Sequence, residues 1–185
     1  MKIMIASDIH GSAYYCRELI KAYKEEEADK LLLLGDILYH GPRNDLPREY
    51  NPKEVAAMLN GISKEILCVR GNCEAEVDQA MLDFPVMGEY AILYAGTRMI
   101  FATHGHKYNM ENVPPMKTGD ILLNGHTHVA KCQAFEKDGE RLVYMNPGSV
   151  SIPKESTPAG YIILEGSNFR WMDFLGNEFL EYNMK

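Results

Sequence analysis

The first half of the chain alternates short apolar runs with segments whose apolar residues recur at helical spacing. Three runs have the length of one buried strand each, namely residues 2–7, 30–34 and 66–70. Ser12 and Asn51 stand at positions suited to helix N-caps, and Pro52 follows at a first helical position. A polar, proline-containing stretch, residues 39–50, precedes the second helix. The pattern predicts strand, helix, strand, surface loop, helix and strand in that order.

The second half alternates between apolar and polar residues with the period of two that half-buried strands have. Dipeptides typical of hairpin turns occur at Ala95-Gly96, Asp138-Gly139 and Gly176-Asn177. Strands are predicted at residues 90–94, 97–103, 121–124, 141–145, 161–165 and 169–174, after a short helix at 74–82. Helices between strands, followed by strands alone, favour packed β-sheets with helices outside, in one α/β domain that spans residues 1–185.

The overall composition is that of a folded globular protein with an acidic balance. Of the 185 residues, 46% are hydrophobic and 24% are charged, and the formal net charge is -7. Such a chain lacks the surplus of Lys and Arg on which binding to duplex nucleic acid depends. An anionic substrate must therefore be attracted by a local positive centre. We expect a small-molecule substrate and no duplex nucleic acid.

The chain also lacks the patterns of an exported or membrane-spanning protein. The apolar run at the start is broken by Ser7 and Asp8 before it reaches the length of a signal-peptide core. The longest apolar runs, such as residues 31–34, are far shorter than the about 20 residues that cross a bilayer as a helix. The four cysteines form no C-x-x-C pair and no disulfide-like spacing. These features favour the reduced cytoplasm, and isologous homo-oligomers are a common default for such proteins.

Five polar clusters each follow directly after a predicted strand. They are Asp8-x-His10, Gly35-Asp36, Gly71-Asn72, His104-Gly105-His106 and Gly125-His126-Thr127-His128. One such cluster is ordinary turn chemistry and proves little. In open α/β sheets, however, ligand sites form beyond the carboxyl ends of strands, so side chains leaving separate strands there can converge. The five together predict one site.

The spacing within two of these clusters suggests how the side chains are presented. Asp8 and His10, like His126 and His128, are two residues apart, which on an extended backbone places both side chains on the same side. Each pair is therefore predicted to chelate one ion. The glycines beside the clusters allow tight bends and close approach of the backbone to a ligand.

The candidate ligands favour a pair of divalent ions. They comprise four imidazoles, two carboxylates and one carboxamide, namely Asp8, His10, Asp36, Asn72, His104, His126 and His128. This set suits Mn²⁺, Fe²⁺ or Zn²⁺, and it exceeds what one tetrahedral site needs. Two ions that share a carboxylate, about 3.5 to 4 Å apart, explain the excess. With a bridging hydroxide, such a centre keeps a net positive charge that attracts phosphate.

In this order the motifs resemble those of the calcineurin-like metallophosphoesterase superfamily, whose pattern runs D-x-H, G-D, G-N-H-[DE], H and G-H-x-H. The resemblance spans the chain and implies a four-layer α/β/β/α sandwich. It implies that Asp8, His10, Asp36 and His128 hold one ion, that Asp36 bridges, and that Asn72, His104 and His126 complete the second site. The activity implied is Mn²⁺-supported hydrolysis of phosphodiesters by the bridging hydroxide, with Zn²⁺, Fe²⁺ and Ni²⁺ as alternative metals.

One position departs from the pattern of the superfamily. Cys73 stands where most members have His after Gly-Asn, so the general acid expected there is not an imidazole. A thiol is a weaker hydrogen-bond donor, and near two cations it can also ionise. We expect Cys73, together with Asn72 and His104, to take part in catalysis, and we expect slow turnover of diesters with poor leaving groups.

Three further side chains are candidates for contact with the substrate. Arg43 and His40 lie in the polar loop, and His106 follows a predicted ligand by two positions. Each has a structural alternative: a solvated or loop-tying Arg is the commoner case, and His106 is equally suited to support a ligand from behind.

Two other classes of protein compete with the phosphodiesterase as interpretations of this pattern. A protein-binding scaffold that keeps this fold without catalysis is disfavoured by the intact ligand set. A metallo-β-lactamase-like hydrolase is excluded, because Val129 and Ala130 follow His128 where its H-x-H-x-D-H motif needs Asp and His.

Overall fold

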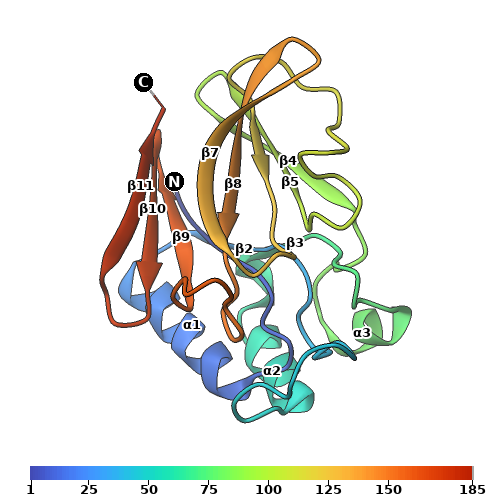
Figure 1. Cartoon of the computed structure of the whole chain (residues 1–185). Helices are drawn as coiled ribbons and strands as arrows, with labels where there is room; N and C mark the ends of the chain where they lie inside the picture. Colours follow the sequence, from blue (N-terminus) through green and yellow to red (C-terminus); the bar gives the residue numbers. More distant parts are fainter. Residues whose placement is uncertain (185) are drawn as a thin grey trace.

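The computed structural model describes residues 1–184, which form two mixed β-sheets packed face to face (Figure 1). Within these residues, the first sheet has six strands in the order β11 (Glu178–Asn183), β10 (Asn168–Asp173), β9 (Gly160–Glu165), β1 (Lys2–Ala6), β2 (Lys30–Leu33) and β3 (Ile66–Cys68). The second has five, in the order β4 (Tyr90–Ala95), β5 (Arg98–Thr103), β6 (Ile121–Leu123), β8 (Glu140–Pro147) and β7 (Ala130–Lys137). The helices are α1 (Ala13–Glu25), α2 (Pro52–Asn60) and α3 (Glu76–Met81), and a 3-10 turn at Ser63–Glu65 precedes β3.

Each sheet has a parallel centre and antiparallel additions. Strands β1, β2 and β3 pair in parallel, as do β5, β6 and β8. Antiparallel strands extend both parallel groups: β9, β10 and β11 in the first sheet, and β4 and β7 in the second. All parallel strands of a sheet end at the same edge, so the loops that follow them are gathered there.

The central strands β1, β2 and β9 of the first sheet are buried on both faces, and alternate residues face opposite sides. In β1, Ile3 and Ile5 face the second sheet, whereas Met4 and Ala6 face the helices. The run of four leucines that begins at Leu31 divides in the same way. This explains why these strands appear in the sequence as continuous apolar runs rather than as alternating ones.

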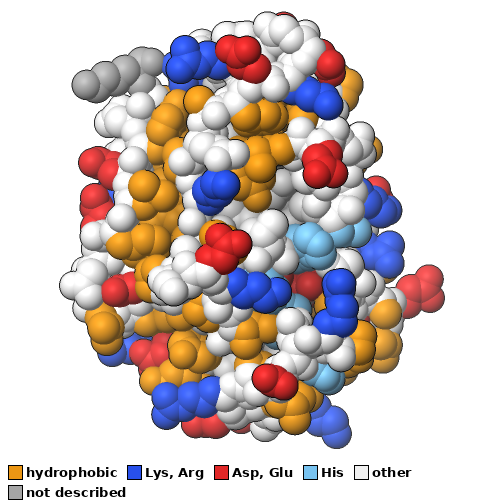
Figure 2. Space-filling model, viewed as in Figure 1, with side chains coloured by type: hydrophobic (Ala, Val, Ile, Leu, Met, Phe, Trp, Pro, Cys, Tyr) orange, Lys and Arg blue, Asp and Glu red, His pale blue; other side chains and the backbone are white. Residues whose placement is uncertain are grey.

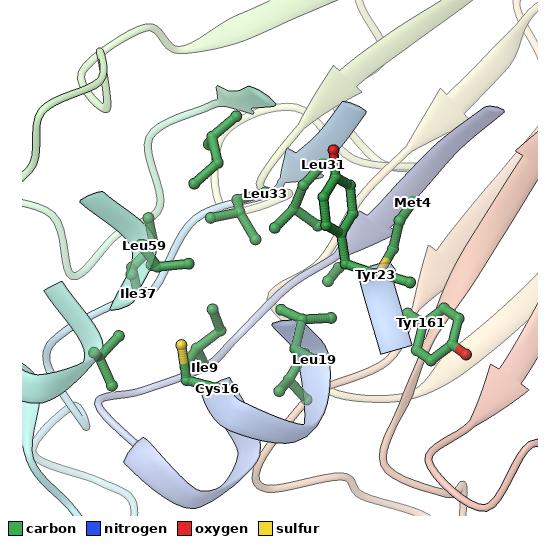
Figure 3. Close-up of a cluster of buried hydrophobic side chains, with 14 of the residues drawn as sticks. Met4, Ile9, Cys16, Leu19, Tyr23, Leu31, Leu33, Ile37, Leu59 and Tyr161 are labelled. Carbon is green, nitrogen blue, oxygen red and sulfur yellow. The ribbon is translucent and has the colours of Figure 1, made fainter. Parts of the chain in front are cut away.

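Helices α1 and α2 cover the outer face of the first sheet, and both begin as predicted. The Ser12 hydroxyl accepts a hydrogen bond from the Tyr15 backbone N–H (3.3 Å), and the Asn51 side chain caps α2. Leu19 of α1 and Leu59 of α2 are fully buried in the cluster shown in Figure 3. Burying one such side chain contributes about 1.5 to 3 kcal/mol. In the described part of the chain, no helix has the length and apolarity needed to cross a membrane.

The second sheet is covered by irregular chain rather than by long helices. On its outer face, Phe101 and Tyr144 pack against Tyr108, Met110 and Met116 of the segment between β5 and β6. The fold is therefore the expected sandwich of two sheets, with its helices concentrated on one side.

Two predicted boundaries that differ from the structure flank the loop between β3 and α3. Strand β3 ends at Cys68 rather than at residue 70, and α3 starts at Glu76 rather than at residue 74. The reason for the second difference is the Glu74 side chain. Its carboxylate is buried and accepts hydrogen bonds from backbone N–H groups at the tips of β2 and β3, so residue 74 belongs to the loop.

Candidate metal centre

The loops after β1 and β6 bring a first group of donor atoms together. Asp8 Oδ1 lies 3.2 Å from His128 Nε2 and 3.5 Å from His10 Nε2, and these two imidazole nitrogens are 3.2 Å apart. All three side chains are buried. Mutual distances below 4.8 Å allow the three atoms to reach a single ion.

A second group comes from the loops after β2, β3, β5 and β6. His104 Nε2 lies 3.4 Å from Asp36 Oδ2, 3.1 Å from Asn72 Oδ1 and 3.2 Å from His126 Nδ1. Asp36, His104 and His126 again have donor atoms close enough for one ion. Asp36 also approaches the first group, because its Oδ2 lies 3.7 Å from His10 Nε2. It is thus the carboxylate placed between the two groups.

The imidazoles are held in the form that presents lone pairs to this space. The Nδ1 atoms of His10, His104 and His128 lie 2.8, 2.7 and 3.0 Å from the backbone carbonyl oxygens of Tyr39, Leu34 and Ile152. An N–H at each Nδ1 donates to that oxygen, so the neutral form of each ring presents its Nε2 lone pair to the cluster. The Nε2 atoms of His10 and His128 would then repel, and the buried Asp8 Oδ1 beside them accepts no hydrogen bond. A positive charge between them satisfies all three, so the donor set fits a metal cation.

The charges of the cluster confirm that it attracts positive charge. Burial alone would raise the pKa of Asp8, but the close imidazoles of His10 and His128 and the charge of His104 outweigh it and hold the pKa well below its usual value. For His104, burial acts to lower the pKa, yet the hydrogen bond to Asp36 and the charges of both carboxylates raise it to about 9. In contrast, burial and the charge of His104 lower the pKa of His126.

The backbone of these loops is left-handed at five of the seven predicted ligands. The φ angles are 59° at Asp8, 51° at His10, 55° at Asp36, 67° at His126 and 63° at His128. Such angles cost about 1 to 3 kcal/mol each in non-glycine residues and cluster at functional sites.

The left-handed angles correct the reasoning from an extended backbone. Asp8 and His10 do converge, but through two left-handed residues and not through the alternation of a strand. His126 and His128 do not form one chelating pair, because His126 lies with Asp36 and His104 whereas His128 lies with Asp8 and His10. The second pair of the sequence prediction was therefore wrong.

Backbone contacts and a buried acid fix these loops. Glu74 accepts hydrogen bonds from the N–H groups of Asp36 (2.9 Å), Ile37 (2.8 Å) and Gly71 (2.5 Å), and so ties the tip of β2 to that of β3. A Cβ at Gly71 would lie 2.6 Å from the Asp36 backbone nitrogen, which requires glycine there. Sequence reasoning assigned Glu74 only to a helix, although the fourth position of the G-N-H-[DE] motif is acidic.

The end of β8 and the turn that follows it hold the backbone of two ligand loops in place. The Ser149 hydroxyl donates to the Asp8 carbonyl oxygen (2.8 Å), and the Asn146 side-chain amide donates to the Gly125 carbonyl oxygen (2.7 Å). A Cβ at Gly125 would lie 2.8 Å from Asp8 Oδ2, so the backbone must pass there without a side chain. By composition this segment is only a turn; the structure shows that it buttresses Asp8 and the loop after β6.

A cavity of about 390 Å³ opens above the cluster. Five of the predicted metal ligands contribute to its lining together with Cys73 and Arg43, and the full set is His10, Asp36, Gly41, Pro42, Arg43, Asn44, Asn72, Cys73, His126, Thr127, His128 and Lys154. Sequence reasoning missed Lys154 and Thr127. Thr127 stands inside the motif Gly125-His126-Thr127-His128, whereas Lys154 lies outside all five polar clusters of the sequence.

His40 and His106 occupy other places. The His40 ring packs edge-on between Tyr39 and Tyr50, with centroid distances of 4.8 and 5.2 Å. The His106 ring lies 5.4 Å from that of His104, and burial together with the charge of His104 lowers its pKa to about 4. Neither belongs to the cavity lining, and their contact with substrate stays a prediction.

The Cys73 thiol faces the cavity in a neutral form. Burial and the negative charge of Asp36 raise its pKa above the usual range, and its backbone N–H donates to Asp36 Oδ1 (2.9 Å). The thiol therefore retains a proton at neutral pH in this arrangement.

The fold and this site are those of a calcineurin-like phosphoesterase. Residues 1–168 match the family model described as the calcineurin-like phosphoesterase superfamily domain, and the chain belongs to this superfamily. The family inferred from the motifs is confirmed.

Its relatives agree with this family. The phosphodiesterase YfcE of Escherichia coli (strain K12) is 43% identical over 165 residues, which cover 89% of this chain and 88% of YfcE. The probable metallophosphoesterase YsnB of Bacillus subtilis (strain 168) is 27% identical, and the match covers 96% and 94% of the two chains. The solved structure of the E. coli phosphoesterase YfcE has a TM-score of 0.94 at 36% identity, with 100% of both chains covered. The predicted metallophosphoesterase sandwich is thereby confirmed.

Proposed function

We propose that this chain hydrolyses phosphodiester bonds at a centre of two divalent metal ions, with Mn²⁺ as the first candidate. Asp8, His10 and His128 would hold one ion, Asn72, His104 and His126 the other, and Asp36 would contact both. The carboxylate of Asp36 supports this division, because its Oδ2 lies within 4 Å of an imidazole nitrogen from each group. The 43% identity to a phosphodiesterase supports the reaction.

The observation that carries the proposal is the convergence of lone pairs at the cavity floor. Three imidazoles are oriented by backbone carbonyls so that Nε2 is an acceptor, and the buried Asp8 Oδ1 beside two of them receives no hydrogen bond. Hydrogen-bond donors would be expected in a cluster built for packing alone. Five left-handed ligand residues are also a cost that a scaffold without metal chemistry would have no reason to keep.

Two such ions supply an ionised water near neutral pH and neutralise charge on the phosphoryl oxygens. The residues of the chain provide the rest. Asp36, held by Glu74 and by the Cys73 N–H, fixes the spacing between the two groups. Asn72 lines the cavity and would orient the phosphoryl group, with the buried His104 3.1 Å behind its Oδ1, and Arg43 would contact the bound substrate from the cavity wall.

Cys73 is placed to meet the leaving group. Its thiol lines the cavity and would donate a proton or a hydrogen bond to the departing oxygen, with water as the alternative donor. Because a thiol is a weak donor, diesters whose leaving group is a stable phenolate are expected to react faster than diesters whose leaving group is an alkoxide.

The test is a comparison of esters and metals with one ligand variant. Purified wild type should hydrolyse bis(p-nitrophenyl) phosphate with Mn²⁺, faster than it hydrolyses p-nitrophenyl phosphate, and chelation should abolish the reaction. His128→Ala removes a donor of the first group and should lower kcat/KM by about 10³-fold, because metal binding and transition-state charge stabilisation fail together. Undiminished activity in that variant, or activity that survives chelation, would contradict the proposal.

A further inference from the structure

Two cationic side chains stand on the wall of the cavity without partners of their own. Arg43 and Lys154 are exposed, both line the cavity, and within residues 1–184 neither the Arg43 guanidinium nor the Lys154 ammonium group makes an ion pair or a hydrogen bond. Figure 2 shows histidine side chains in a hollow of this face, with Lys or Arg side chains beside them. In a chain with a formal net charge of -7, this local surplus of positive charge does not follow from composition.

Both cations are on segments tied to the imidazoles of the site. The Lys154 backbone N–H donates to the His128 carbonyl oxygen (2.9 Å), and His128 Nδ1 in turn contacts the Ile152 carbonyl oxygen (3.0 Å). On the other wall, His10 Nδ1 contacts the Tyr39 carbonyl oxygen (2.8 Å) at the start of the segment that carries Arg43. The backbone at Lys154 and at the start of the segment that carries Arg43 is thus held by bonds to residues that supply the candidate metal donors.

The single negative charge of a simple phosphodiester does not need these cations to balance it. Such a diester carries one negative charge, and two divalent ions with Asp8, Asp36 and a hydroxide already match it. Two acidic residues lie close in sequence to these cations, Asp45 to Arg43 and Glu155 to Lys154. Both are exposed, and neither lines the cavity. Asp36, already assigned to the metal centre, is the carboxylate of the cavity lining. Arg43 and Lys154 are therefore left to meet another anion.

We infer that Arg43 and Lys154 form an anion subsite, so that the preferred substrates are phosphodiesters with a second anionic group, a phosphate or a carboxylate, on one ester arm. This inference rests on the proposed phosphodiesterase activity. Arg43 offers a planar fork that matches either anion with two hydrogen bonds, and Lys154 adds a point charge. A neutral arm leaves both cations unpaired, and a cationic arm is repelled.

The experiment compares diesters that share the p-nitrophenyl leaving group and differ in the other arm. The set contains ethyl p-nitrophenyl phosphate, its analogues whose ethyl group ends in a carboxylate or a phosphate, and p-nitrophenyl phosphorylcholine. With Mn²⁺-loaded wild type, kcat/KM should be about 10-fold higher for an anionic arm than for the neutral one, and lowest for the choline ester. The carboxylate and phosphate analogues show which anion the subsite prefers.

Two variants and a control assign the preference to these residues. Lys154→Met and Arg43→Gln should each reduce the ratio of anionic to neutral kcat/KM by about 3-fold, and the double variant should bring it close to one. Lys24→Met removes an exposed positive charge from α1, away from the cavity, and should leave the ratio unchanged. The preference should also weaken as ionic strength rises.

The outcomes separate the inference from the proposed function. If the neutral diester is hydrolysed as fast as the anionic ones, or if the double variant keeps the full preference, the anion subsite is refuted and the phosphodiesterase stands. If wild type hydrolyses none of the diesters with any of the metals, the proposed function is refuted and the inference falls with it.

Discussion

Strand β1 and the loop that follows it are adjacent in sequence but obey opposite rules. In β1, apolar side chains alternate between two cores and the extended backbone pairs with β2 and β9. The loop then buries Asp8 and His10 with left-handed φ angles of 59° and 51°. Both choices are locally unfavourable, so the surrounding structure must hold them.

The difference shows how the stability of the fold is separated from the geometry of its site. The Asp8 and His10 N–H groups donate to the carbonyl oxygens of Gly35 (3.1 Å) and Asp36 (2.9 Å), so the tips of β1 and β2 fix each other. The strands need no such help, because their pattern already agrees with the fold. Substitutions in the strands and helices should therefore change stability, whereas substitutions in the loops should change chemistry.

The largest expected effect is at the loop after β2. Asp36→Asn keeps an oxygen that can accept from the Cys73 N–H but removes the charge between the two donor groups. We expect kcat/KM for bis(p-nitrophenyl) phosphate to fall by about 10³-fold. The unfolding free energy of the metal-free protein, from urea denaturation, should change by less than about 1 kcal/mol, because the fold does not rest on this charge. If Asp36→Asn retains a tenth or more of wild-type activity, the loops do not control the chemistry as proposed, and the contrast between strands and loops fails.

The converse effect is expected in the helix layer. Leu19 is fully buried between α1 and the first sheet, so Leu19→Ala should lower the unfolding free energy by about 2 to 5 kcal/mol through lost burial and a residual cavity. At temperatures where the variant is folded, kcat/KM should stay within about 2-fold of wild type. Lys21→Ala, at an exposed position of the same helix, is the matched control and should change the free energy by less than about 0.5 kcal/mol. A large loss of activity in folded Leu19→Ala would show that core and site are not separable.

A smaller effect is expected where the two regions touch. Trp171 is buried between the sheets, and its Nε1–H donates to the Asn146 carbonyl oxygen (2.7 Å). Asn146 in turn holds the Gly125 carbonyl oxygen of the ligand loop (2.7 Å). Trp171→Phe should cost about 1 to 3 kcal/mol, because it leaves a buried carbonyl without a donor. A modest fall in Mn²⁺ affinity, measured by calorimetry, should accompany the loss of stability. Unchanged affinity would mean that the hydrogen bond from Trp171 to Asn146 has no influence on the metal centre.

Much of the fold was predictable from local pattern. Strands β1, β2 and β9 are buried on both faces, so they appear in the sequence as unbroken apolar runs, and Ser12, Asn51 and Pro52 mark helix starts by their chemistry. Strands β7 and β11 were implied only by the hairpin turns before or after them. The irregular cover of the second sheet has no periodic signal and could not be foreseen.

The sequence predicts which residues form the site, but it does not predict the backbone conformation that places them. Placement of Asp, Asn and His after separate strands indicates convergence, since carboxyl ends of parallel strands share an edge. Asp and His adopt left-handed φ more often than other non-glycine residues, but most Asp and His residues do not, so residue type alone does not predict this angle at Asp8 or His126. The position of Lys154 on the cavity wall depends on its backbone bond to His128, which joins segments that no motif connects.

Crystals grown with Mn²⁺, with anomalous diffraction recorded at the manganese edge, test the central claim most directly. We predict two anomalous peaks about 3.5 to 4 Å apart, one against Asp8, His10 and His128 and one against Asn72, His104 and His126, with Asp36 contacting both. A single peak, or peaks away from these seven side chains, would contradict the two-ion centre on which the proposed chemistry depends.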